Sequence, residues 1–275
     1  MKKVLVIGDV IEDIIVISKG PKQTNTDNPS SIKATPGGSG ANFAVWLASL
    51  GVETELVARV SSKDKERLES YFKRVKVIPR LEADPSQETG KIVVLVEENN
   101  RTFYTDRAAN QNLELNNLDL TGIHLLYISG YSVISLGETK TQQVIQAAKN
   151  LGIQVAVDPG STSFIESFGK DKFLSAIRGA DLIFPNQEEY LLLEEGITSF
   201  PEVVLTKGEL GAEVVGVGKV EAVRVEVVDP TGAGDAFAAK YLAEKLSGSG
   251  ALAALEFANN FAALAVTRPG GQPLL

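Results

Sequence analysis

Short apolar runs alternate with longer segments of mixed polarity along most of this chain. The apolar runs have the length and composition of buried strands, and the segments between them have helical length. The expected strands are 4–7, 55–58, 125–128, 153–157, 181–184 and 202–205. The expected helices are 39–50, 63–72, 138–150, 172–178, 187–195, 234–246 and 251–267. This alternation predicts a mainly parallel sheet with helices on both faces.

Two stretches break the alternation. Segments 14–18, 31–35, 91–97 and 101–106 are strand-like and have no helix between the members of each pair. Residues 98–100, Glu-Asn-Asn, give a hairpin signal between the last two. We therefore expect one domain over 1–275 with a small antiparallel sheet, formed by about 14–35 and 90–107. Such a sheet can serve as a lid that excludes water from a site.

Composition and charge exclude several classes of function. The formal net charge is -8, whereas a nucleic-acid partner requires a basic face. The absence of cysteine excludes disulfides, thiolate metal sites and cysteine nucleophiles. The one histidine, His124, is expected at the start of a buried strand, which speaks against a Ser-His-Asp relay. The first apolar run is too short for a signal peptide or a membrane span, so we expect a cytoplasmic protein with no membrane partner.

Polar residues follow directly after three of the expected strands. These are the Asp-Pro at 158–159, the Pro-Asn at 185–186 and the Thr-Lys-Gly at 206–208. The carboxyl ends of parallel strands lie at one edge of a sheet, where open α/β sheets bind their ligands. The sequence therefore places the ligand site at this edge.

The strongest chemical signal is the segment Asp-Pro-Thr-Gly-Ala-Gly-Asp at 229–235, directly before an expected helix. Its glycines leave backbone N–H groups uncovered at a helix N-terminus, which favours a bound anion such as a phosphoryl group. Asp235 would repel that anion. A carboxylate that merely stabilises the helix start would explain Asp235 but not the glycines. A general base beside a phosphoryl site explains both.

Two familiar nucleotide-binding loops are missing. The chain has no Gly-x-x-x-x-Gly-Lys-Ser/Thr, so it is not a P-loop enzyme. No Gly-x-Gly-x-x-Gly follows the first strand, which argues against a nicotinamide-dependent dehydrogenase.

Two segments resemble the signatures of the ribokinase-like (PfkB) carbohydrate kinase family. Residues 229–237, Asp-Pro-Thr-Gly-Ala-Gly-Asp-Ala-Phe, resemble the C-terminal signature, and residues 36–44, Pro-Gly-Gly-Ser-Gly-Ala-Asn-Phe-Ala, resemble the N-terminal one. They lie about 190 residues apart in the family's order, and the resemblance spans Gly8 to Gly270. It implies a three-layer α/β/α fold with a mainly parallel central sheet and a small β-sheet lid. It also implies an ATP- and Mg²⁺-dependent kinase.

The resemblance implies roles for individual positions. Asp235 matches the catalytic base, and the anion hole matches Gly232, Ala233 and Gly234. The nucleotide is expected at Asn186, Thr206, Gly208 and Asn259, with Glu189 acting on Mg²⁺ through water. The substrate is expected at Asp13, Gly37, Gly38 and Asn42. A monovalent cation is a further candidate cofactor, and a homodimer that pairs through the lid is a candidate assembly.

The lid stretch 101–110 matches no single substrate subgroup. Arg107 and Asn110 are candidates for substrate contact, as is Tyr104. Arg107 fits two alternatives, a reader of a carboxylate or phosphate on the acceptor and a salt bridge of the lid.

The expected acceptor is a primary hydroxyl of a sugar or a related polyol. A nucleoside kinase is the alternative within the family, but Phe103 and Tyr104 are the only prominent aromatic residues near the lid. A non-catalytic sugar- or nucleotide-binding regulator on the same fold is a third alternative, against which the retained Asp235 argues.

Overall fold

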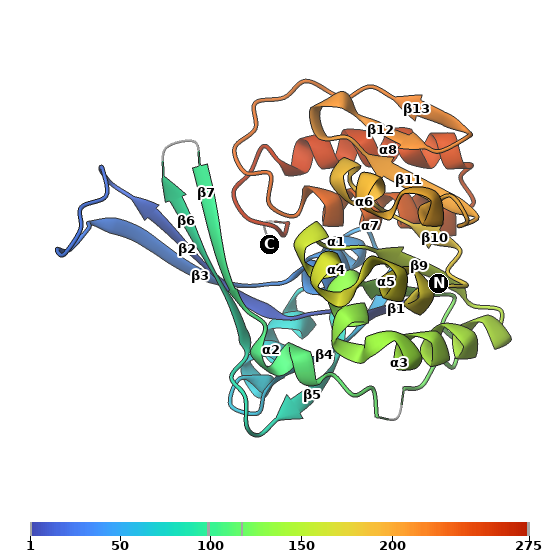
Figure 1. Ribbon diagram of the computed structural model, residues 1–275, viewed down its shortest axis with the longest axis horizontal. Coiled ribbons are helices and arrows are strands. Elements are labelled where there is room, and N and C mark those ends of the chain that lie inside the picture. Colours follow the sequence, from blue (N-terminus) through green and yellow to red (C-terminus); the bar gives the residue numbers. More distant parts are fainter. Residues whose placement is uncertain (1, 98–99, 117, 274–275) are drawn as a thin grey trace.

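The computed structural model describes residues 2–97, 100–116 and 118–273, which form a large sheet and a small one (Figure 1). Within these residues the large sheet has nine strands, in the order β13-β12-β11-β10-β9-β8-β1-β4-β5. They are β1 (Lys3–Ile7), β4 (Glu53–Ser61), β5 (Val77–Asp84), β8 (Leu125–Ser129), β9 (Gln154–Asp158), β10 (Leu182–Ile183), β11 (Glu202–Thr206), β12 (Ala212–Val214) and β13 (Gly218–Val220). All neighbours from β5 to β11 are parallel, and β12 and β13 are antiparallel additions.

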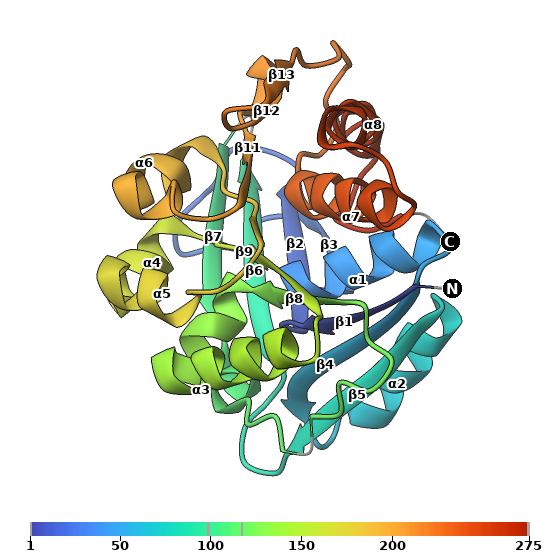
Figure 2. The same ribbon diagram turned by 90° about the vertical axis from the view of Figure 1, so that its right-hand side faces the viewer.

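Helices cover both faces of the large sheet, as the alternating pattern predicted (Figure 2). One face carries α1 (Ser39–Ser49), α2 (Lys65–Arg74), α7 (Ala233–Leu246) and α8 (Ala251–Ala265). The other carries α3 (Gly130–Asn150), α4 (Thr162–Phe168), α5 (Lys170–Ala176) and α6 (Gln187–Ile197). Each face has its own apolar core. On the first face, the rings of Phe43 and Tyr127 stack 3.6 Å apart.

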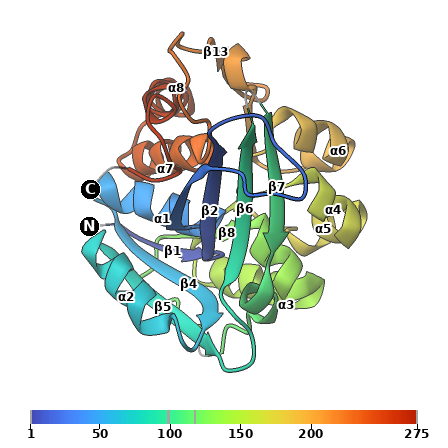
Figure 3. The same cartoon turned by 90° about the vertical axis from the view of Figure 1, so that its left-hand side faces the viewer.

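Four strands outside the large sheet form the lid. They are β2 (Ile11–Ser18), β3 (Ser30–Gly37), β6 (Gly90–Glu97) and β7 (Asn100–Asp106), in the order β3-β2-β6-β7. The lid projects from the core and lies in front of it in Figure 3. It is not wholly antiparallel, because β2 pairs with β6 in parallel. Of the predicted turn 98–100, residues 98 and 99 lie outside the described residues.

Three strands, helix α4 (Thr162–Phe168) and part of helix α3 were not predicted from the sequence. Strand β5 contains Pro79 and several charged residues, which hide its apolar positions, and β12 and β13 have only three residues each. Helix α3 begins at Gly130 rather than 138, and its backbone leaves the helical conformation at Gly137, where φ is 76°. His124 directly precedes the buried strand β8, close to its expected place at the start of that strand, and its own side chain is exposed. No described helix is long and apolar enough to cross a membrane.

Candidate active site

A cavity of about 230 Å³ lies at the carboxyl ends of the central strands. Its walls come from β9, α6, β11 and α7, together with residues from α1 and α3. Seven of its lining residues were given roles from the sequence, namely Asn186, Glu189, Thr206, Gly232, Ala233, Gly234 and Asp235. The structure therefore brings the phosphate turn and residues from all three strand-end motifs into one cleft.

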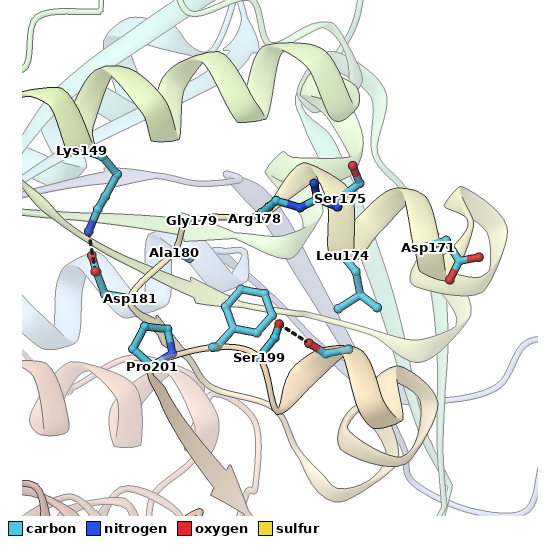
Figure 4. Close-up of a pocket in the computed structure, with 12 residues that line it drawn as sticks. Lys149, Asp171, Leu174, Ser175, Arg178, Gly179, Ala180, Asp181, Ser199 and Pro201 are labelled. Carbon is cyan, nitrogen blue, oxygen red and sulfur yellow. Dashed lines mark hydrogen bonds and ion pairs between the residues drawn. The ribbon is translucent and has the colours of Figure 1, made fainter.

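A second cavity, of about 640 Å³, lies at the opposite edge of the sheet (Figure 4). Its lining includes residues that directly precede β10 and β11, such as Gly179 and Pro201. Lys149 and Asp181 form an ion pair in its wall. None of the residues that the sequence singled out lines this cavity. The smaller cleft is therefore the candidate active site.

Gly232 shapes the phosphate turn before α7. Its φ is 72°, a conformation that glycine adopts readily, and a Cβ there would lie 2.5 Å from the carbonyl oxygen of Gly271. Gly234 differs, because a Cβ at that position would meet nothing within 4 Å. No described side chain caps the N-terminus of α7. The Ala233 N–H donates to the Pro230 carbonyl oxygen over 3.2 Å, and the other N–H groups of the first turn can face an anion in the cleft.

Asp235 lies in the first turn of α7 with only 8% of its surface exposed. The Ser39 hydroxyl donates a hydrogen bond to Oδ1 over 2.8 Å. Burial raises the pKa of Asp235 to about 7, hydrogen bonds from Ser39 and Asn42 lower it, and the Asp9 and Asp13 carboxylates raise it again. A carboxylate with this pKa is suited to exchange protons near neutral pH.

Asp13 lies within strand β2, which begins at Ile11 rather than at residue 14. Burial raises its pKa to about 7, and the charges of Asp9 and Asp229 act in the same direction. A Cβ on Gly37 would collide with the Asp13 carboxylate, and a Cβ on Gly38 would lie 2.7 Å from the carbonyl oxygen of Asp9. Because these two glycines have no side chains, Asp13 in β2 and Asp9 after β1 can pack against the start of α1.

Asn186 and Glu189 begin helix α6 as a capping box. The Asn186 side chain accepts from the Glu189 N–H, and Glu189 Oε2 accepts from the Asn186 N–H, both over 2.9 Å. Glu189 is nonetheless buried at the cleft, and burial raises its pKa to about 7. The motif therefore has a structural role of its own.

Asp158, at the end of β9, lies beside Glu189 and was not assigned a role from the sequence. Burial and then the Glu189 charge raise its pKa well above the usual range. The described residues contain no group of three or more acidic or histidine side chains that could hold a metal ion directly. The buried Glu189 and the partly buried Asp158 fit a Mg²⁺ that is also held by water and phosphate. The Asp-Pro directly after a strand was the signal that pointed to this position.

Two expected nucleotide contacts lie outside the cavity lining. Asn259 is buried on α8, and its Nδ2 donates to the carbonyl oxygen of Glu221 over 2.9 Å. Gly208 begins the short 3-10 helix η2 (Gly208–Leu210), two residues beyond Thr206, which does line the cavity. In the structure, the side chain of Asn259 supports the loop that precedes α7.

Arg107 joins the lid to the core through a buried ion pair. Its Nη1 lies 3.1 Å from Asp9 Oδ2, and the guanidinium lies 4.4 Å from the ring centre of Tyr131. Only 8% of Arg107 is exposed, and its buried Nη2 has no hydrogen-bond partner among the described residues. The Nη1 atom of Arg107 therefore has a structural role, whereas Nη2 remains available as a hydrogen-bond donor.

Asn110 holds the same junction from the 3-10 helix η1 (Ala108–Asn112). Its Oδ1 accepts from the Val10 N–H over 3.0 Å, and its Nδ2 donates to the Val10 carbonyl oxygen over 2.9 Å. Both ends of the amide are engaged with backbone at the start of β2.

Comparisons with known proteins give matches over nearly the whole chain. The model of the family described as "pfkB family carbohydrate kinase" matches residues 1–275. A ribokinase of Bacillus subtilis (strain 168) is 26% identical, covering 99% of this chain and 95% of the relative. A nucleoside kinase of Methanocaldococcus jannaschii is 28% identical, covering 90% and 85%. The crystal structure of a putative ribokinase II from E. coli in complex with ATP and Mg²⁺ superposes with a TM-score of 0.85 at 25% identity, covering 98% and 94%.

Proposed function

Because the chain belongs to the pfkB family of carbohydrate kinases, and is therefore a phosphotransferase with an alcohol acceptor, we propose that it phosphorylates a sugar hydroxyl with ATP. The acceptor hydroxyl is a primary one. The observation that carries this proposal is the buried Asp235 beside an uncapped glycine turn in the cleft.

In this mechanism the acceptor oxygen attacks the γ-phosphorus while its proton passes to Asp235. A bond forms between the acceptor oxygen and phosphorus, and the bond to the β,γ-bridging oxygen breaks, so that ADP leaves. The N–H groups of the turn at Gly232–Gly234 stabilise the charge on the transferred group. Glu189 and Asp158 would hold Mg²⁺ beside the phosphates, where the ion neutralises their negative charge. Asp13 accepts hydrogen bonds from other hydroxyls of the acceptor.

A sugar suits the cleft better than a nucleoside. Phe103 and Tyr104 are both more than half exposed, and neighbouring strand residues point to opposite faces of a sheet. Phe103 shares a face with Asp13, since Val94 pairs with Phe103 and lies two residues from Ile92, the partner of Asp13. Only one of these two rings can therefore stack on a base. Nucleoside phosphorylation is the second candidate, because relatives of both kinds match the chain.

A panel of acceptors tests the proposed function. Neutral sugars, sugar acids and nucleosides are incubated with ATP and Mg²⁺, and ADP release is followed in a coupled assay. We expect at least one sugar to give acceptor-dependent turnover above that of every nucleoside. Parallel assays with K⁺ and with tetramethylammonium test activation by a monovalent cation. A panel in which only nucleosides react would favour the second candidate, and no turnover at all would refute the proposal.

Arg107 offers its unused Nη2 donor to an anionic group on the acceptor. Arg107→Lys keeps a positive charge for Asp9 but loses the fork of donors. We expect this variant to raise the KM for sugar acids by about tenfold or more and to leave the KM for neutral sugars nearly unchanged. Equal changes for both kinds of acceptor would make Arg107 purely structural.

Arg107→Ala provides the matched stability measurement. It leaves Asp9 buried without its cation, which we expect to lower the free energy of unfolding by about 3–5 kcal/mol. Adding Asp9→Asn to Arg107→Ala removes the stranded charge and restores part of that loss. Chemical denaturation measures both changes.

The lid is the proposed surface of a homodimer. It exposes several large apolar side chains, with 68% of Ile32 and 59% of Tyr104 accessible to solvent. Residues 16 and 93, the strand partners of Ile32 and Tyr104, are also apolar. We expect a dimer in light scattering coupled to size exclusion, and a monomer for Ile32→Lys. Leu252→Lys, at an exposed apolar position on α8, is the control that should stay dimeric. A wild-type monomer at micromolar concentration would contradict the proposal.

A further inference from the structure

A short segment that follows helix α8, residues 270–272, lies directly behind the phosphate turn. The Asp229 carboxylate joins this segment to the turn. Its Oδ1 accepts from the Thr231 N–H and its Oδ2 accepts from the Gly270 N–H, both over 2.9 Å. The carboxylate therefore fixes the start of the turn and the start of the segment relative to each other.

Gly271 packs against Gly232, the residue of the turn that has a positive φ. A Cβ on Gly232 would lie 2.5 Å from the carbonyl oxygen of Gly271 and 2.7 Å from its Cα, closer than real side chains approach. The two backbones are therefore in direct contact, and a shift of Gly271 leaves Gly232 without its support. Gly232 itself lines the catalytic cleft.

Trp46 of helix α1 holds Gly271 in this position. Its Nε1 donates to the Gly271 carbonyl oxygen over 2.8 Å, and its ring meets the Phe261 ring of α8 edge to face, 5.3 Å between centres. Only 6% of Trp46 is exposed, so water has little access to this hydrogen bond. The oxygen that Trp46 binds is also the atom of Gly271 that lies nearest to the Cβ position of Gly232.

Other contacts hold the residues on either side of Gly271. Gln272 Nε2 donates to Asn42 Oδ1 over 2.9 Å, and the residue before Gly271 is bound by Asp229. Within the part of the chain that the structure describes, the Trp46 N–H is the only hydrogen-bond partner of Gly271. Removal of this one donor therefore frees the carbonyl group that supports the turn, while its neighbours stay attached.

We propose that Trp46 is a positioning residue for phosphoryl transfer, because its indole N–H holds Gly271 against Gly232 and so fixes the turn relative to the transferred group. Trp46 does not line the cleft, so it acts through Gly271 alone. The stabilisation of charge by backbone N–H groups depends on their exact placement, and a displacement of about 1 Å can cost about 10²-fold in rate. The proposal rests on the proposed function, in which the turn binds the phosphoryl group.

The chain has a single tryptophan, which allows the donor alone to be removed. Benzothienylalanine at position 46 has sulfur in place of the indole N–H and keeps the shape of the ring. 5-Fluorotryptophan at the same position keeps the N–H and is the matched control. Trp46→Phe is a second variant, which removes the donor and leaves a smaller ring beside Phe261.

We expect the benzothienylalanine protein to lose about ten- to hundredfold in kcat, while the KM for the acceptor changes by less than about twofold. The turn shifts relative to the transferred group, whereas the contacts of the bound acceptor persist. The 5-fluorotryptophan protein should keep the kcat of the wild type. Ser49→Ala removes a hydrogen bond to the Trp46 carbonyl oxygen on the same helix and should keep it as well. A merely structural role would lower the melting temperature and leave kcat per folded molecule unchanged.

Hydrogen exchange followed by mass spectrometry measures the same packing without any acceptor. In the benzothienylalanine protein and in Trp46→Phe, we expect exchange to become about fivefold faster in peptides that cover 229–236 and 266–273. The Thr231 and Gly270 N–H groups, which both bind Asp229, lie in these peptides. Peptides from β8 and β9 should exchange as in the wild type, because the fold as a whole is intact.

Unchanged exchange in both peptides of the benzothienylalanine protein would overturn the proposal, and so would faster exchange there with the kcat of the wild type. Where the benzothienylalanine protein fails to fold, the same two results in Trp46→Phe decide. Faster exchange over the whole chain would make Trp46 a general stabilising residue and would also overturn it. The exchange measurement needs no substrate, so a failed acceptor panel counts against the proposed function and leaves the contact between Trp46, Gly271 and the turn to be judged by exchange.

Discussion

Asp235→Asn is expected to lower kcat by about 10²–10⁴-fold, because the acceptor hydroxyl loses its general base. Asparagine has nearly the same shape and can keep a hydrogen bond to Ser39, so we expect the KM values for ATP and acceptor to change by less than about threefold, as ground-state contacts persist. Steady-state kinetics with the acceptor found in the panel measures both. Activity within tenfold of wild type would rule Asp235 out as the base.

The pH dependence of the wild type supports or refutes the same role. The base must be ionised, and burial raises the pKa of Asp235 to about 7, so kcat should rise with pH through about 7. The stability of the fold should follow the opposite trend. Because the folded-state pKa lies above the usual value, ionisation of this buried group destabilises the native state as pH rises from the usual pKa to about 7, and the loss is complete above that pH. Asp235→Asn should remove this contribution, so its stability relative to wild type should increase between pH 4 and pH 8.

Gly234→Ala is expected to give the second-largest loss, about 10²–10³-fold in kcat, with little change in stability. A Cβ at Gly234 meets no protein atom within 4 Å, so the fold accommodates it. The same open space belongs to the cleft in which the phosphoryl group is proposed to sit. The new methyl group should therefore displace the anion from the backbone N–H groups. Kinetics and a thermal melt measure the two effects.

Gly232→Ala is the matched control for Gly234→Ala, because we expect it to lower the stability of the fold. It forces a positive φ on alanine and a contact with Gly271, so we expect it to lower the melting temperature markedly. If Gly234→Ala instead melts early and keeps its activity, the turn is a structural element and not an anion site.

The central sheet and most of its helices were predictable because parallel strands are buried on both faces. Such strands appear as uninterrupted apolar runs, as in β1, β8 and β9. Strand β5 lies at the edge, where its alternate residues face solvent, and its mixed composition gave no such run. The register of the lid was also out of reach, because β2 and β6 are far apart in the chain and no local pattern specifies a parallel pair.

The site was predictable where its chemistry resides in consecutive residues. The turn at 229–235 and the strand-end motifs occur in the cleft together, as their positions after strands indicated. The sequence could not show that Arg107 pairs with Asp9, or that Asn110 binds backbone, because these contacts cross about 100 residues.

Four connections join the lid to the core, namely β1–β2, β3–α1, β5–β6 and β7–η1. Asp9 takes part in three of them. It accepts from Gly40 at the start of α1, pairs with Arg107 after β7, and lies in the link between β1 and β2. The loop from residue 19 to 29, at the distal end of the lid, makes none of these contacts. Changes in length or composition there should therefore leave the root of the lid in register with Asp235. The fold thus keeps the variable loop 19–29 apart from the root of the lid, whose position relative to Asp235 has to be preserved.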